Sequence, residues 1–217
     1  MAIETKRPMI KETVGALYVA FNTPKENGDF DIETYEGTKR RDVVKQISTT
    51  ENAESTVVRA SGGDYVTASQ TSSVEQSVEV VAFDTDVVAR MRGDKIGKYL
   101  IKSGASAQRP YFAFGKVVKK LGGVVEYVWY PKCQLAENTD DIATSEENFS
   151  EQNDTLTIKA LSFDDAGNKS VRISSEMSNF PTGLTEDMFF DKVLTTDDEI
   201  DAIIAKLTPE QESIQGA

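Results

Sequence analysis

A period-two pattern of polar and apolar residues constrains the fold of this chain more than any other feature. It is clearest in VTASQTSSVEQSVEVVAF at positions 66–83, and it begins near Ser55. Small and β-branched residues alternating over such a length predict extended strands with one packed face and one wet face. Gly62 and Gly63, followed by Asp64, predict a hairpin turn before this run. The polar positions are Thr67, Ser69, Thr71, Ser73, Glu75, Ser77 and Glu79, and the apolar ones include Val66, Ala68, Val74, Val78, Val80 and Ala82.

Further strands are predicted on both sides of this hairpin. VGALYVAFN (14–22) is an apolar, β-rich run, and KRRDVVKQIST (39–49) has a mixed periodicity that we interpret as a strand. FGKVVKKLGGVVEYVWY (114–130) predicts a hairpin in which Gly122 and Gly123 adopt the positive φ of the turn. TLTIKALSF (155–163) and KSVRISSEM (169–177), separated by DDAGN, predict another. With eight or so strands, the chain is expected to be mainly β.

Helical patterns are few. Asp84 or Thr85 can cap a short helix that Gly93 ends. LTEDMFFDKVL (184–194) and TTDDEIDAIIAKLTPEQ (195–211) are also helix-like, and Thr196 with Glu199 forms a capping box for the second. Its apolar face is Ile200, Ile203, Ile204 and Leu207.

These patterns predict a mainly β domain with one short helix and a short helical C-terminal tail. The expected β domain covers residues 1–180, with an N-terminal arm at 1–13 and a long polar loop at 23–41. Residues 181–217 are the expected helical C-terminal extension.

Composition removes most enzyme classes. The chain has no histidine and a single cysteine, so imidazole acid–base steps, Ser–His or Cys–His pairs, His-ligated zinc and an internal disulfide framework are excluded. The net charge of −12 disfavours an ordinary nucleic-acid-binding domain, which needs clustered cations. No apolar run approaches bilayer length, and the first residues lack the apolar core of a secretory signal. We therefore expect a soluble protein that is neither exported nor inserted in a membrane.

The stretch EYVWYPKCQL (126–135) holds the only Trp and the only Cys. Cys133 has only Lys132 beside it, and neighbouring strand residues point to opposite faces, so we interpret Cys133 as a small hydrophobic residue. Tyr127 and Trp129 share a face and could stack a base or sugar, but packing is favoured. Pro131 is expected to end the strand.

Three short polar clusters each allow more than one interpretation. NGDFDIE (27–33) and DDAGN (164–168) carry oxygens that calcium prefers, but neither has EF-hand spacing, so turn chemistry is favoured. The cations Lys39, Arg40 and Arg41 are as consistent with ion pairing to an acidic neighbouring subunit as with a solvated stretch. The wet face of the alternating run could line a smooth, mildly anionic channel or simply face solvent.

The order of patterns resembles a family. ETYEGTKRRDVVKQISTTENAESTVVRASGGDYVTASQTSSVEQSVEVVAFDTDVVARMRG (33–93) is similar to the front half of the major tail proteins of long-tailed siphophages that infect Gram-positive bacteria. RPYFAFGKVVKKLGGVVEYVWYPKCQLAENTDDIATSEENFSEQNDTLTIKALSF (109–163) resembles their closing pattern, with a Trp-Tyr-Pro-Lys-like step and a DTLTIKAL-like strand. The likeness covers roughly residues 10–175, and residues from about 181 depart from it.

The resemblance implies a structural virion protein without enzymatic activity or cofactors. The implied fold is the β-sandwich or barrel of tail-tube proteins, with one short flanking helix. Such subunits form rings, typically hexameric, whose strands close one β-barrel, and the rings stack into a tail tube that conducts DNA. Implied partners are further copies of the chain, the tape-measure protein, the tail terminator and distal tail proteins, with transient, non-specific passage of DNA. The implied location is the virion tail, assembled in the host cytoplasm. On this basis Thr67, Ser69, Thr71, Ser73, Glu75, Ser77 and Glu79 are expected to line the channel, and Lys39, Arg40 and Arg41 to contact the next ring.

Two alternatives remain at this stage. A virion adhesin or decoration module that binds host carbohydrate would be favoured by aromatic residues clustered in loops, whereas here they lie in strand-like runs. An enzyme that uses carboxylates alone is the other, but no carboxylate pair stands out in an apolar setting.

Overall fold

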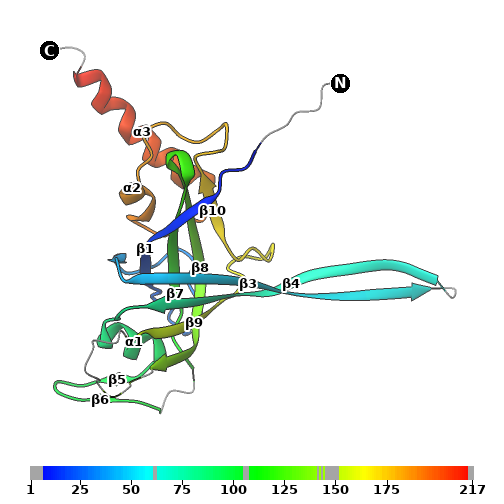
Figure 1. Ribbon diagram of the computed structural model, residues 1–217, viewed down its shortest axis with the longest axis vertical. Helices are drawn as coiled ribbons and strands as arrows, with labels where there is room; N and C mark the ends of the chain where they lie inside the picture. The colour runs from blue at the N-terminus through cyan, green and yellow to red at the C-terminus, as the bar shows by residue number, and fades with distance from the viewer. Residues whose placement is uncertain are drawn as a thin grey trace.

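The computed structural model describes residues 7–60, 63–104, 108–140, 142, 144 and 152–214. Its strands are β1 (Lys11–Phe21), β2 (Lys39–Arg41), β3 (Val44–Ala60), β4 (Gly63–Val80), β5 (Lys95–Ile96), β6 (Ile101–Lys102), β7 (Phe112–Lys120), β8 (Val124–Asp140), β9 (Asp154–Ala160) and β10 (Val171–Ser174). Its helices are α1 (Thr85–Arg92), α2 (Glu186–Phe190) and α3 (Asp197–Ile214), with a 3-10 turn at Leu121–Gly123. The fold is mainly β, as predicted, with three helices beside the strands (Figure 1).

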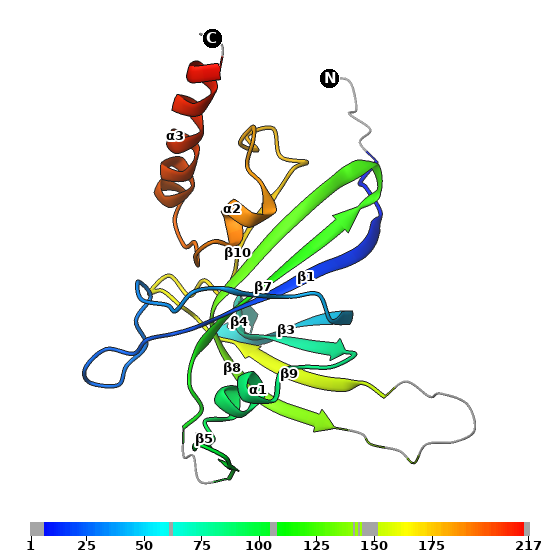
Figure 2. The same ribbon diagram turned by 90° about the vertical axis from the view of Figure 1, so that its left-hand side faces the viewer.

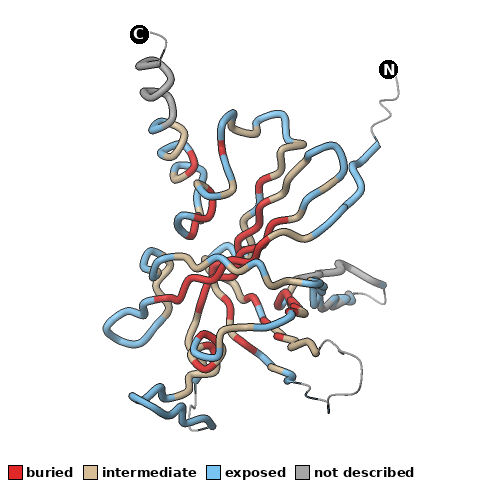
Figure 3. Tube along the Cα trace, turned by 60° about the vertical axis from the view of Figure 1, so that its left-hand side comes forward, coloured by how far each residue is buried: buried red, intermediate tan, exposed pale blue. Residues whose placement is uncertain are grey.

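One antiparallel sheet with the order β2-β1-β7-β8-β9-β4-β3 forms the body, and β10 pairs with β8. The first part of β8 pairs with β7 and β10, and its last part, from Cys133, pairs with β9. The sheet therefore continues through β8 from one layer to the other. Between the layers lies a core built from β1, β7 and β8 on one side and β4 and β9 on the other, with Val87 and Met91 of α1 packed into it. Figure 3 shows the buried residues gathered where the strands cross.

A bulge at Pro131 and Lys132 carries β8 between the layers. Tyr130 pairs with Phe114 and Cys133 with Phe112, so two residues of β8 oppose one of β7. Proline has no N–H to donate, and a bulge is where a sheet tolerates it. The prediction that Pro131 ends the strand is therefore wrong, because β8 continues to Asp140.

A second hydrophobic cluster lies on the opposite side of β1, β7 and β8. There Tyr18, Tyr127 and Trp129 pack against Phe189 and Phe190 of α2. Leu184, Val193, Leu194 and Ile200 complete the buried part from the C-terminal segment. Figure 2 shows α2 and α3 beside the strands β7 and β10. Residues 184–200 thus pack against the β strands as a third layer of the same body.

Several local predictions are confirmed. Helix α1 begins after Asp84 and ends at Gly93, whose φ is 76°. Gly122 and Gly123 have φ values of 80° and 78° in the β7–β8 turn. Glu199 accepts hydrogen bonds from the backbone of Thr195 and Thr196, which is the carboxylate half of the predicted capping box. The predicted hairpin around DDAGN is wrong: β9 and β10 do not pair with each other, and both pair with β8.

The hairpin of β3 and β4 is the longest feature of the fold. Its strands have 17 and 18 residues, yet β4 pairs with β9 only from Val74 to Val80. The rest is a two-stranded ribbon that projects from the body (Figure 1). The sequence predicts that this hairpin begins near residue 55, but it begins at Val44. Strand β3 takes in the second half of the separate strand that was expected at 39–49.

Candidate functional site

The most distinctive surface is the outer face of the layer formed by β3, β4, β9 and the end of β8. Residues directly opposite each other in adjacent strands share a face, so the pairing register defines it. We call this surface the polar face. Its members are Gln46, Ser48 and Thr50 of β3, Glu75, Ser77 and Glu79 of β4, Thr155, Thr157 and Lys159 of β9, and Gln134, Glu137 and Thr139 of β8.

The reverse side of the same strands is core. Val78 and Val80 of β4 are fully buried. On β9, Leu156, which pairs with Val78, and Ile158, two residues further along, are also fully buried. A shift of one residue in strand pairing would move these side chains into water and the polar side chains into the core. The orientation of the polar face is therefore fixed by burial of the other face.

The polar face is mildly anionic and lacks aromatic and aliphatic side chains. It carries three glutamates, Glu75, Glu79 and Glu137, against the single cation Lys159, which lies opposite Glu75. Asn153 donates a hydrogen bond of 2.9 Å to Oε1 of Glu79. Hydroxyl and amide groups can hydrogen-bond water or a passing solute, but they offer no dense positive charge to hold phosphates.

Three of the seven residues predicted for this surface lie on it: Glu75, Ser77 and Glu79. Ser73 precedes them but is only 3% exposed. Thr71 lies beyond a bulge, where Asn52 pairs with Ser73 and the next residue of β3 pairs with Thr71. This bulge inverts the alternation, so the prediction that Thr71 shares the face of Glu75 is wrong. The side chains of Thr67 and Ser69 lie outside those the structure describes.

Sequence reasoning missed the contributions of β3, β8 and β9 to the polar face. The alternation Thr155, Thr157, Lys159 is visible in DTLTIKA, but its adjacency to β4 is a long-range pairing. Only the register shows that these hydroxyls extend the surface of Glu75, Ser77 and Glu79.

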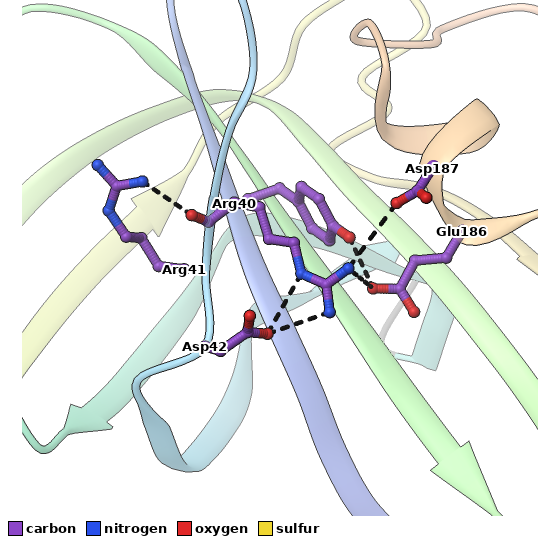
Figure 4. Close-up of polar contacts among 6 residues, drawn as sticks. Arg40, Arg41, Asp42, Glu186 and Asp187 are labelled. Carbon is purple, nitrogen blue, oxygen red and sulfur yellow. Dashed lines mark hydrogen bonds and ion pairs between the residues drawn. The ribbon is translucent and has the colours of Figure 1, made fainter.

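The predicted cationic cluster is largely paired within the chain. Arg40 on β2 lies 3.2 Å from Asp42, 3.5 Å from Glu186 and 3.8 Å from Asp187 (Figure 4). Tyr18 also donates a 2.6 Å hydrogen bond to Oε1 of Glu186. This network ties an edge strand to α2.

Arg41 binds Asp84, the residue that precedes α1. In the same region Arg90 of α1 pairs with Glu36, and this contact keeps the pKa of Glu36 below its ordinary value. Of the three predicted contact residues, two therefore have partners inside the chain. Lys39 is half-buried on the same short strand.

The aromatic stretch of β8 is packing, as predicted. Trp129 is fully buried, and its indole nitrogen donates to the carbonyl of Phe189 at 3.3 Å. Cys133 is also fully buried, and burial raises the pKa of its thiol far above the ordinary value. A thiol held protonated in this way is a poor nucleophile.

The two oxygen-rich loops make turn hydrogen bonds. Asn27 accepts from the backbone of Asp29 at 3.0 Å, and Asp164 accepts from the backbone of Asn168 at 2.8 Å. Among the described residues, no group of three or more His, Cys, Asp or Glu side chains could hold a metal ion. Nor does any described helix have the length and hydropathy needed to cross a bilayer.

A buried polar cluster was not predicted. Lys116 on β7 is only 8% exposed, and its amino group donates to Thr49 Oγ1 at 2.6 Å and to Gln76 Oε1 at 2.9 Å. Burial, together with the nearby cation Lys11, lowers the pKa of Lys116 to about 8. The sequence does carry a signal for this cluster. Gln76 interrupts the series of apolar residues on the core face of β4, and Lys116 interrupts the corresponding series on β7.

No family model matches the chain, and comparison with curated proteins gives no match either.

Proposed function

We propose that the chain is a structural subunit that assembles into stacked rings, forming a tube of the kind built by the tail proteins of siphophages. The observation that carries the proposal is the polar face: a continuous surface over four strands, rich in Ser, Thr, Gln and Glu, backed by a hydrophobic core. This is the surface expected of a wall along which DNA slides.

The charge of the polar face supports passage of DNA. A wall rich in Lys and Arg would release counterions from each phosphate it met and hold the DNA strongly. Hydroxyl and amide groups avoid this, and Glu75, Glu79 and Glu137 add weak repulsion. Lys159 is the one cation among the residues that define the polar face, and its neighbour across the strand pair is Glu75. Lys45 adds a second cation at the margin, where its amino group lies 3.3 Å from Oδ1 of Asn153.

The free edge of β3 supports assembly. Within the described sheet β3 is the terminal strand, with 17 residues paired only to β4. A long unpaired edge is a template for another strand, and closing the sheet into a barrel across subunits removes it. Such a barrel would place the polar faces of all copies around one lumen.

The order of layers supports the same orientation. From the polar face outward come the β8-β9-β4-β3 layer, the core, the β2-β1-β7-β8-β10 layer, and then α2 and α3. If the polar face lines the channel, the helices form the outer wall of the tube. The partners proposed with this function are further copies of the chain, a tape-measure protein, a tail terminator and distal tail proteins, in the tail of a virion.

Electron microscopy of the concentrated protein tests the proposal. Stacked rings or tubes with a central channel are the expected result. A chain that stays monomeric at every concentration, even when seeded with tail components, and that binds glycan arrays would instead support the carbohydrate-binding alternative.

The orientation of the polar face can be tested in the same assemblies. Ser48→Cys places a thiol on the polar face, and Asp201→Cys places one on the exposed side of α3. In tubes, the thiol at position 48 should react with a small maleimide but be protected from a maleimide carrying a large polymer. The thiol at 201 should react with both, and open reaction at 48 with the polymer reagent would contradict the proposal.

A further inference from the structure

The small hairpin of β5 and β6 exposes apolar side chains to an unusual degree. Tyr99 is 83% exposed and Leu100 is 69% exposed, and Ile96 beside them is also exposed. The backbone of Gly97 donates to the carbonyl of Leu100 at 2.8 Å, so Lys98 and Tyr99 form the tip of a tight turn. Contiguous exposed apolar residues on a well-formed turn mark an interaction site.

The same hairpin is positively charged in an otherwise acidic chain. Lys95, Lys98 and Lys102 lie on it, and none forms an ion pair with another residue that the structure describes. Lys98 instead lies over the ring of Tyr99, 4.8 Å from its centroid. A partner for this tip must therefore offer both an apolar recess and negative charge.

Such a recess exists on the same chain. The loop after β1 and the segment between α2 and α3 line an open cavity of about 580 Å³. Its apolar walls include Ile32, Tyr35 and Val193. We call this cavity the acidic socket, since its lining also holds Glu33, Glu36, Asp191 and Glu199 against the single cation Lys192.

Two of the four acids of the socket are free to receive a cation. Glu36 pairs with Arg90, and Glu199 pairs with Lys192. The carboxylates of Glu33 and Asp191 have no ion-pair partner among the described residues. Unpaired lysines on the hairpin thus match unpaired carboxylates in the socket, and the exposed Tyr99 and Leu100 match its apolar walls.

The hairpin and α3 lie at opposite ends of the molecule in both views (Figures 1 and 2). The socket includes the residues just before α3 and also Glu36, which pairs with Arg90 of α1, the helix that precedes the hairpin. That the contact forms between two copies rather than within one is part of the inference. From this geometry we infer that the β5–β6 hairpin of one copy inserts Tyr99 and Leu100 into the acidic socket of a second copy. A contact between two different patches is head-to-tail, and it propagates into a stack unless rotation closes it. The inference rests on the proposed function and gives the contact between successive rings.

Disulfide trapping between two variants tests the contact directly. Tyr99→Cys and Glu33→Cys are purified separately, mixed and mildly oxidised, with buried Cys133 left in place. A disulfide-linked heterodimer is expected, whereas Tyr99→Cys mixed with Asp165→Cys, an exposed position outside the socket, should give little. Equal cross-linking in both mixtures would overturn the inference.

Electron microscopy of a second variant separates this inference from the proposed function. Tyr99→Ser with Leu100→Ser removes the apolar tip without touching the core or β3. The expected result is that the variant forms single rings. Tubes should appear only at a protein concentration about tenfold higher than the unmodified chain needs. Tubes formed as readily as by the unmodified chain would overturn the inference and leave the proposed function standing. Failure of the unmodified chain to form rings or tubes would count against the proposed function, while the cross-linking still judges the contact.

A charge exchange gives the last control. Lys98→Glu should weaken stacking, and combining it with Glu33→Lys in the same chain should restore part of it. Asp165→Lys makes the same charge change outside the socket and should restore nothing. Restoration by Asp165→Lys as large as by Glu33→Lys would mean that net charge alone governs stacking, and the proposed contact would be wrong.

Discussion

The amino group of Lys116 lies 2.9 Å from Oε1 of Gln76, between the two layers of strands, with no carboxylate bonded to it. Each of these residues interrupts an otherwise apolar strand face. Oε1 of Gln76 accepts from both Lys116 and Thr49, whereas Nε2 of Gln76 is buried without a hydrogen-bond partner among the described residues. Such a cluster stabilises only one pairing of the layers, because any other arrangement leaves a buried amine without acceptors.

The buried amine makes stability depend on pH. The pKa of Lys116 is about 8 in the folded chain against 10.5 for a free lysine, so between these values the unfolded chain binds more protons. The free energy of unfolding should therefore rise with pH over this window relative to Lys116→Met, by about 3 kcal/mol in total. Urea unfolding at several pH values measures it. Lys119→Met, on the exposed side of β7, is the control, and parallel pH profiles for wild type and Lys116→Met would refute the prediction.

Truncating a side chain should lower the free energy of unfolding much more on the core face of β4 than on its polar face. Val78 is fully buried, so Val78→Ala removes core contacts and should cost about 2 kcal/mol of unfolding free energy. Ser77→Ala, on the polar face, should change it by less than about 0.5 kcal/mol. Thermal and denaturant unfolding of the two variants measure the difference. Similar losses from both would mean that the polar face is buried as well.

Adding cations to the polar face should create affinity for DNA. Ser77→Lys with Thr157→Lys places two amines beside Lys159, and binding to duplex DNA should appear at low salt and vanish as salt rises. Ser178→Lys with Asn179→Lys adds the same charge at exposed residues elsewhere. Fluorescence anisotropy with labelled DNA compares the two. Equal binding by both variants would show that net charge, and not the polar face, controls contact with DNA.

Gly115 should be indispensable for docking the C-terminal segment. A Cβ there would lie 2.7 Å from Cε1 of Phe190 and 3.0 Å from Cζ3 of Trp129. Gly115→Ala must therefore displace the aromatic cluster, at about 1–3 kcal/mol, and loosen residues 184–200. Limited proteolysis should then cleave near α2 sooner than in wild type. Gly37→Ala, where a Cβ meets nothing within 4 Å, is the matched control.

Local chemistry explains which parts of the fold were predictable. The alternation around Val74 and Val78 identifies β4 and its core face, and Asp84 with Gly93 marks the ends of α1, because these signals act within a few residues. The sequence predicts packing for Tyr127 and Trp129, and this is confirmed, but nothing in the sequence indicates that Phe189 and Phe190 are the residues they pack against.

The sequence predictions that are wrong or incomplete concern residues whose environment is set by contacts distant in sequence. Pro131 reads as a strand end, but the bulge that accommodates it requires β7 as a partner. Arg40 looks like a free cation until α2 supplies Glu186, which lies far along the chain. Likewise Thr155 and Thr157 join the polar face only through the pairing of β9 with β4.

The bulge in β8 also has a mechanical meaning. One covalent backbone runs from Trp129, held in the aromatic cluster under the helices, past Pro131 to Glu137 and Thr139 on the polar face. Shear applied to the polar face is therefore carried along peptide bonds into the outer layer, rather than across hydrogen bonds between strands. The sandwich resists delamination at this strand, since the two layers cannot separate there without breaking the chain itself.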